Sequence, residues 1–178
     1  LRARCPDNNL VLAYPALTSF VEEERAEIAD PVTDTPGVSG CDLPVGLSLD
    51  GALGRLTSAA FPDDPEAAEE ALRLLLTSAK GYPVELPAET VLLHAHSSRV
   101  ARPVLLVGLG RDHWSVPTLN GPVRLLLGLL NPADNPPECH LRTLAELGRR
   151  FQNPVFLQAL QSATRAEEVV QAISRPLS

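Results

Sequence analysis

Hydrophobic residues recur with helical spacing over two neighbouring segments in the first half of the chain. The first segment covers residues 47–60. The second opens with Asp64 and Pro65, an N-cap residue followed by a proline in the first helical turn, and continues to about residue 79. Apolar residues at every third or fourth position are typical of a helix that buries one face. The pattern therefore predicts two consecutive amphipathic helices.

Three shorter apolar runs follow, and they predict β-strands. They cover residues 90–93, 103–109 and 122–130. The last two are continuously apolar, as expected of strands that are covered on both faces.

The rest of the chain has helical patterns. Residues 137–151 and 154–160 form two of them, and Thr164 with Glu167 forms a capping-box pattern before a third. The order is thus two helices, three strands and three helices. This order predicts an α/β (α+β) domain in which a small sheet is covered by helices.

The first 44 residues have a different pattern. Residues 17–29 are a short helical candidate and residues 9–14 a candidate edge strand, and residues 30–40 are rich in proline, glycine and small polar residues. We therefore expect residues 1–44 to be a linker or peripheral arm and residues 45–178 to be the domain.

Composition and charge narrow the function classes. A net charge of −7, with Lys80 as the single lysine, argues against a nucleic-acid partner. No apolar run reaches the 18 or so residues of a membrane span, and no signal peptide is visible. The three cysteines are far apart and odd in number, which favours a reducing compartment over a disulfide framework. We expect a cytoplasmic domain without direct membrane insertion, and its oligomeric state, a homo-oligomer included, stays open.

The histidines are the candidate chemical groups. His94 and His96 lie where a predicted strand ends in a polar loop, and His140 lies in the first turn of a predicted helix. A neutral imidazole is nucleophilic near pH 7 and can carry a phosphoryl group. Two other interpretations are open: a hydrogen-bonded structural histidine, and a metal site built on His-x-His, for which no acidic or cysteine ligand stands at a fixed spacing. His113 reads as a surface residue in a turn between strands.

Three segments together resemble the type-2 enzyme IIA domains (mannitol, fructose and nitrogen class) of the bacterial phosphotransferase system. Residues 93–103 read Leu-His-Ala-His-Ser-Ser-Arg-Val-Ala-Arg-Pro and are similar to the active-site segment of that family. Residues 121–132 resemble its glycine-proline-valine strand, and residues 139–147 its His-Leu-x-x-Leu helix. The resemblance covers residues 47–173. It implies the mannitol IIA-like fold, a small mixed sheet between helices.

The resemblance also implies site residues. The phosphorylated histidine of the family falls on His94, and the histidine that lies close to it falls on His140. The resemblance implies no metal and no cofactor. One departure is that residues 77–83 lack the arginine-glutamate pair usual in the family, so that Lys80 is the nearby cation; a second is Leu93 in place of a proline. Residues of the active-site segment that could bind or support the phosphate are His96, Ser97, Ser98, Arg99 and Arg102.

Two functions follow from the resemblance. The first is a phosphoryl-carrier or phosphorylation-sensing domain that accepts phosphate from a phosphocarrier protein and regulates or energises solute transport, with a IIB domain as the receiving partner. The second is a non-catalytic regulatory domain attached to the membrane part of a transporter, such as a cation antiporter or permease, and tethered by it to the inner membrane. A metal-dependent enzyme is a distant third.

Overall fold

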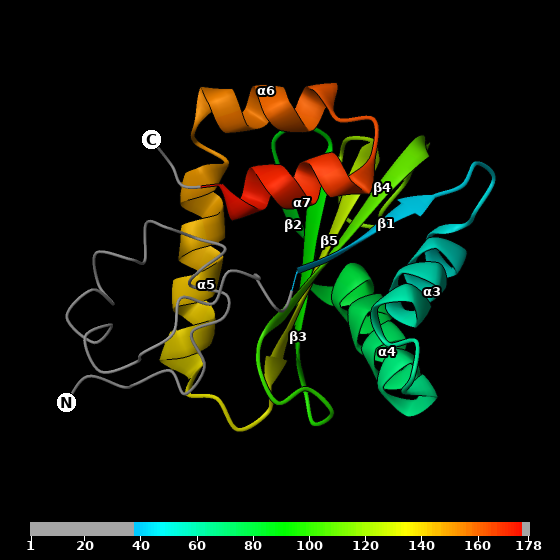
Figure 1. The fold of residues 1–178 in the computed structure, drawn as a ribbon, viewed down its shortest axis with the longest axis vertical. Coiled ribbons are helices and arrows are strands. Elements are labelled where there is room, and N and C mark those ends of the chain that lie inside the picture. Colours follow the sequence, from blue (N-terminus) through cyan, green and yellow to red (C-terminus); the bar gives the residue numbers. More distant parts are fainter. Residues whose placement is uncertain (1–37, 176–178) are drawn as a thin grey trace.

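A five-stranded mixed sheet forms the centre of residues 38–175, the part of the chain that the computed structural model describes (Figure 1). The strand order is β1-β4-β5-β3-β2. Strands β1 and β4 are parallel, as are β3 and β5, whereas β4 with β5 and β2 with β3 are antiparallel. The strands are β1 (Val38–Leu43), β2 (Val84–Leu86), β3 (Thr90–Ser97), β4 (Val104–Trp114) and β5 (Val123–Pro132).

Helices cover both faces of the sheet, as Figure 1 shows. One core cluster joins the sheet to the first helix pair and the other joins it to the last three helices. Along β3, Leu92 belongs to one cluster, and Val91 and Leu93 belong to the other, because successive side chains of a strand point to opposite faces. The helices are α3 (Leu49–Ala60), α4 (Pro65–Gly81), α5 (Pro137–Arg150), α6 (Pro154–Ser162) and α7 (Ala166–Ser174).

The first helix begins at Leu49, two residues after the predicted start, and the second begins where the sequence predicts. Ser48 caps α3, and its hydroxyl accepts a hydrogen bond from Gly51 N over 3.1 Å. Asp64 caps α4 by accepting one from Ala67 N over 3.0 Å, and Pro65 occupies the first helical position. Each cap satisfies an N–H group that has no partner within its helix.

The structure differs from the sequence prediction at β1. This strand lies inside the stretch 1–44 that was expected to be a linker or arm, yet it pairs with β4 over six positions. The side chain of Asp42 accepts a hydrogen bond from Ala166 N over 2.6 Å and so joins β1 to the start of α7. These contacts involve residues that are distant in the sequence. The local pattern of glycine and small polar residues therefore does not predict a strand here. The helix and strand expected at 17–29 and 9–14 lie outside the described residues.

Two further local predictions are wrong. The residues expected to form a turn around His113 continue β4, which has a bulge between Leu109 and Trp114. The capping acid of α7 is Glu168, not Glu167: its carboxylate accepts hydrogen bonds from the N–H groups of Thr164 and Arg165, over 2.6 and 3.1 Å.

Candidate functional site

His94 and His140 form a hydrogen-bonded pair on the side of the sheet covered by α5. His140 Nε2 lies 3.0 Å from His94 Nδ1. His94 shares a face of β3 with Leu92, whose core cluster includes Leu147 of α5. The strand thus directs the His94 ring toward α5, and the first turns of α5 bring the second imidazole to it. His94 is half-buried, whereas His140 is only 8% exposed.

Asn131 completes a chain of three side chains. Its amide Nδ2 is hydrogen-bonded to Nδ1 of His140. Asn131 stands beside His96 in the register between β5 and β3, and it is 1% exposed. The order of contacts is therefore Asn131, His140, His94, running from the core toward the surface.

Two more rings surround the pair. The His96 ring centroid lies 4.7 Å from that of His140, and the Tyr82 centroid lies 5.3 Å from that of His94. Strand β2 pairs Val84 with Leu92, and the same register continued by two residues sets Tyr82 opposite His94. The main-chain N–H of His94 donates to the hydroxyl of Ser78 in α4 over 3.0 Å. His94 is therefore fixed at both its backbone and its ring.

The environment keeps both imidazoles neutral at pH 7. Burial, with a smaller contribution from the charge on His96, lowers the pKa of His94. Burial, followed by the charges on His94 and His96, lowers the pKa of His140 from 6.5 to about 4. A neutral ring retains a lone pair on one nitrogen, as a nucleophile or hydrogen-bond acceptor requires.

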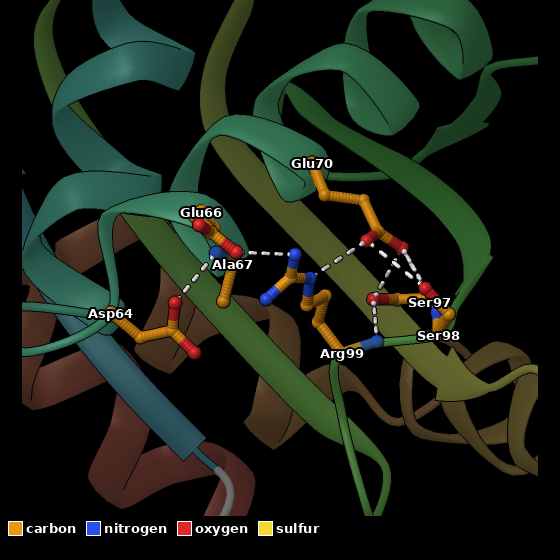
Figure 2. Close-up of polar contacts among 7 residues, drawn as sticks. All are labelled: Asp64, Glu66, Ala67, Glu70, Ser97, Ser98 and Arg99. Carbon is orange, nitrogen blue, oxygen red and sulfur yellow. Dashed lines mark hydrogen bonds and ion pairs between the residues drawn. The ribbon is translucent and has the colours of Figure 1, made fainter.

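The loop after β3 is held by Glu70 of α4, as Figure 2 shows. The Glu70 carboxylate accepts hydrogen bonds from the Ser97 hydroxyl over 3.0 Å and from Ser98 N over 2.9 Å. The Ser98 hydroxyl also donates to it, over 3.1 and 3.2 Å. Arg99 forms ion pairs with Glu66 and with Glu70. Three of the residues predicted from the sequence to support phosphate thus contact α4, and Ser97 lies on the face of β3 opposite His94.

The remaining candidates lie away from the histidine pair. Lys80 lines an open groove with Arg73 and Thr77, whereas Ser78, two positions before Lys80 and therefore on the opposite side of the helix, faces His94. Arg102 is exposed in the loop between β3 and β4. His113 lies 3.1 Å from Glu89, which precedes β3, at the opposite end of that strand from the loop held by Glu70.

Within residues 38–175, no group of three or more His, Cys, Asp and Glu side chains is placed to share a metal ion. No helix in this range is long and apolar enough to cross a bilayer.

The cysteines differ from the sequence expectation, because Cys41 is a free thiol but Cys139 is disulfide-bonded.

Sequence reasoning missed Asn131, Tyr82, Ser78 and Glu70. Asn131 could have been found from the sequence. It stands two positions after Leu129 near the end of β5, so its polar side chain lies on the same face of the strand as Leu129, the face toward α5. Ser78 and Glu70 come from α4 and reach the site through the packing of that helix against β3. Tyr82 follows α4 and reaches it through the pairing of β2 with β3.

A family model and several solved structures match the chain. The family model described as "Phosphoenolpyruvate-dependent sugar phosphotransferase system, EIIA 2" matches residues 55–175. No curated protein matches the chain.

Solved structures match over most of the chain. The nitrogen regulatory protein IIA-Ntr from Neisseria meningitidis is 20% identical with a TM-score of 0.63, and the match covers 76% of this chain and 92% of that one. IIA mannitol from Escherichia coli is 14% identical with a TM-score of 0.55 and coverages of 77% and 95%. The Escherichia coli complex of enzyme IIA mannitol with phosphorylated enzyme IIB mannitol gives 12% identity, a TM-score of 0.55 and coverages of 78% and 94%. The α/β fold with a small mixed sheet between helices, expected from the sequence, is confirmed.

Proposed function

Since the chain belongs to the EIIA 2 family of the phosphoenolpyruvate-dependent sugar phosphotransferase system, we propose that it is a phosphoryl-carrier or phosphorylation-sensing domain whose acceptor is His94. The observation that carries the proposal is the contact between His94 Nδ1 and His140 Nε2, at 3.0 Å. It occupies one nitrogen of His94 and leaves the other, Nε2, to react.

The transfer exchanges one N–P bond for another. The lone pair of His94 Nε2 attacks the phosphorus of a phosphohistidine on the donor, and the donor nitrogen leaves with the bonding electrons. His140 holds the His94 ring in a fixed orientation through Nδ1, which reduces the entropy lost on reaching the reactive geometry. The neutral state of both rings supports this role, because a protonated His94 has no lone pair to donate.

The positive end of α5 favours the incoming phosphate. The helix begins at Pro137, three residues before His140, and the N–H groups of its first turn give that end a partial positive charge. For the receiving partner, the solved complex of a mannitol IIA enzyme with a phosphorylated IIB enzyme supports a IIB domain. A phosphocarrier protein as donor and a cytoplasmic location belong to the same proposal.

Phosphorylation in a defined mixture tests this function. The chain is incubated with enzyme I, the phosphocarrier protein and phosphoenolpyruvate, and intact mass is measured. We expect one acid-labile phosphate on the wild type, none on His94→Ala, and normal uptake by His113→Ala, the matched control near the other end of β3. If the wild type takes up nothing while a mannitol IIA domain is labelled in the same mixture, the carrier function is wrong. If His94→Ala is still labelled, the acceptor lies elsewhere.

A second function is favoured by the pairing of Arg99. Its guanidinium is engaged by Glu66 and Glu70, and Lys80 lines the same open groove, on the side of α4 opposite Ser78. Cations that serve other contacts do not bind phosphate. This arrangement therefore suits a domain that regulates a membrane transporter without carrying a phosphoryl group. This function predicts no phosphate uptake together with a full-length gene that encodes membrane-spanning segments, and a gene without such segments contradicts it.

A further inference from the structure

Asn131 is the innermost member of the side-chain series that ends at the proposed acceptor. It lies near the end of β5 and is 1% exposed, and its amide contacts Nδ1 of His140. Among the hydrogen bonds within residues 38–175, this one is made by the side chain of Asn131.

The direction of each hydrogen bond in this series fixes the direction of the next. A neutral imidazole carries one N–H group and one lone pair. When Asn131 presents Nδ2, Nδ1 of His140 accepts, so that the proton of His140 is on Nε2 and is donated to His94 Nδ1. The proton of His94 is then on Nε2, and that nitrogen has no lone pair for a phosphorus atom.

A half-turn of the Asn131 amide reverses the series when the ring protons move with it. The half-buried His94 releases its Nε2 proton to solvent, the shared proton passes from His140 Nε2 to His94 Nδ1, and one proton returns from solvent to His140 Nδ1. The amide group has nearly the same shape in both orientations, so the core accommodates either one. With Oδ1 toward His140, Nδ1 of His140 carries the proton and donates it to the amide. His140 Nε2 then accepts from Nδ1–H of His94, and the lone pair of His94 is on Nε2.

We propose that Asn131 is a positioning residue whose amide orientation selects the tautomers of His140 and His94, with Oδ1 toward His140 as the reactive state. The inference rests on the proposed function for its consequence in phosphoryl transfer, but the tautomers themselves exist without it. The observation behind this proposal is the contact of the Asn131 amide with Nδ1 of His140. The proposal itself assigns the orientation with Nδ2 toward His140 to the resting state.

The phosphorylated state keeps the reversed direction. Once Nε2 of His94 forms the bond to phosphorus, Nδ1 carries the remaining ring proton and donates it to His140 Nε2. His140 in turn donates from Nδ1 to Asn131 Oδ1. No proton leaves the series during the transfer, and the donor histidine departs with the electron pair of the broken N–P bond.

Two substitutions at Asn131 separate the orientations. Asn131→Asp presents oxygen in both orientations and so holds the reactive direction, whereas Asn131→Leu keeps a similar size without a hydrogen bond. Asn153→Asp is the matched control, because Asn153 is the N-cap of α6, a position where either residue is accepted.

The tautomers are read from ring ¹⁵N chemical shifts of the complete chain at pH 7.5. We expect the His140 proton on Nε2 in the wild type and in Asn153→Asp, and on Nδ1 in Asn131→Asp before any phosphorylation. We expect Asn131→Leu to show averaged shifts. If His140 has the same tautomer in the wild type and in Asn131→Asp, the proposal is wrong, even if no variant accepts phosphate.

The rate of phosphate uptake provides the second measurement. We expect Asn131→Leu to lose about tenfold in initial rate, since the hydrogen bond that fixes the tautomer is gone, and Asn131→Asp to recover most of that loss. A Leu variant as fast as the wild type would overturn the positioning role. Absence of uptake in the wild type itself would instead contradict the proposed function and leave the NMR result to decide the role of Asn131.

Discussion

The site depends on single residues whose neighbours change their chemistry. His140 is surrounded by the rings of His94 and His96 and by the Asn131 amide, in a position that is 8% exposed. Burial lowers the pKa of His140, so its imidazole is neutral near pH 7 when it contacts His94. Because its charged form is disfavoured only when the chain is folded, stability and protonation are linked.

This linkage predicts a loss of stability in acid. The folded pKa of His140 is about 4, below its ordinary value of 6.5, so between these values the unfolded chain binds the proton more strongly and stability falls as the pH is lowered. We expect the free energy of unfolding to drop between pH 7 and pH 4.5 by roughly 2–3 kcal/mol more in the wild type than in His140→Gln. Urea unfolding at both pH values measures the difference. Equal losses in the two proteins would contradict the shift.

At the scale of elements, helix α4 supports the candidate site at two separate points. Ser78 binds the backbone of His94, and Glu70, two turns earlier, binds the loop that follows β3. Burial raises the pKa of the Glu70 carboxyl, but hydrogen bonds from Ser98 and Ser97, with the charge on Arg73, outweigh it, so the pKa lies below its usual value. The carboxylate is therefore the form that holds the loop.

Alanine substitutions at two adjacent glutamates of α4, Glu70 and Glu69, test the Glu70 contacts. Glu70→Ala removes the acceptor and leaves the buried Ser97 hydroxyl without it, so we expect a loss of about 1–2 kcal/mol in the free energy of unfolding. Glu69→Ala changes an exposed neighbour and should stay within about 0.5 kcal/mol of the wild type. Urea unfolding at pH 7 gives both values. Equal effects of the two substitutions would mean that Glu70 does not hold the loop.

At the scale of the whole molecule, close packing between the helices and the sheet fixes the layers. A Cβ atom on Gly128 of β5 would lie 2.9 Å from Leu75 Cδ1 of α4, and one on Gly108 of β4 would lie 3.3 Å from Leu56 Cδ2 of α3. Each glycine thus gives a leucine direct access to the backbone of the sheet. Strand β5 carries both Gly128 and Asn131, so the packing of α4 against β5 also affects the position of Asn131 in the site.

A double-mutant cycle tests the packing of α4 on β5. We expect Gly128→Ala alone to destabilise by about 1–3 kcal/mol through crowding and Leu75→Ala alone by about 2–5 kcal/mol through a cavity. The double variant should lose less than the sum, because the new methyl group enters the space that Leu75 vacates. Gly148→Ala in α5, where a Cβ meets nothing within 4 Å, is the control and should be neutral or stabilising. Additive losses in the double variant would contradict the contact.

Local patterns in the sequence were sufficient for the five helices and the three longer strands of residues 38–175 and for the family, but not for β1 and β2. The cap at Asp64, the apolar runs of β4 and β5, and the histidine motifs depend on residues that are close in the chain, so sequence alone determined them. Tertiary structure decided the pairing of β1 with β4, the contact of Glu70 with the loop after β3, and the meeting of His94, His140 and Asn131. These join residues up to 124 positions apart, as in Asp42 with Ala166. Hydrogen-bond direction and burial arise only when such residues meet, and in the proposed function they determine which nitrogen of His94 reacts.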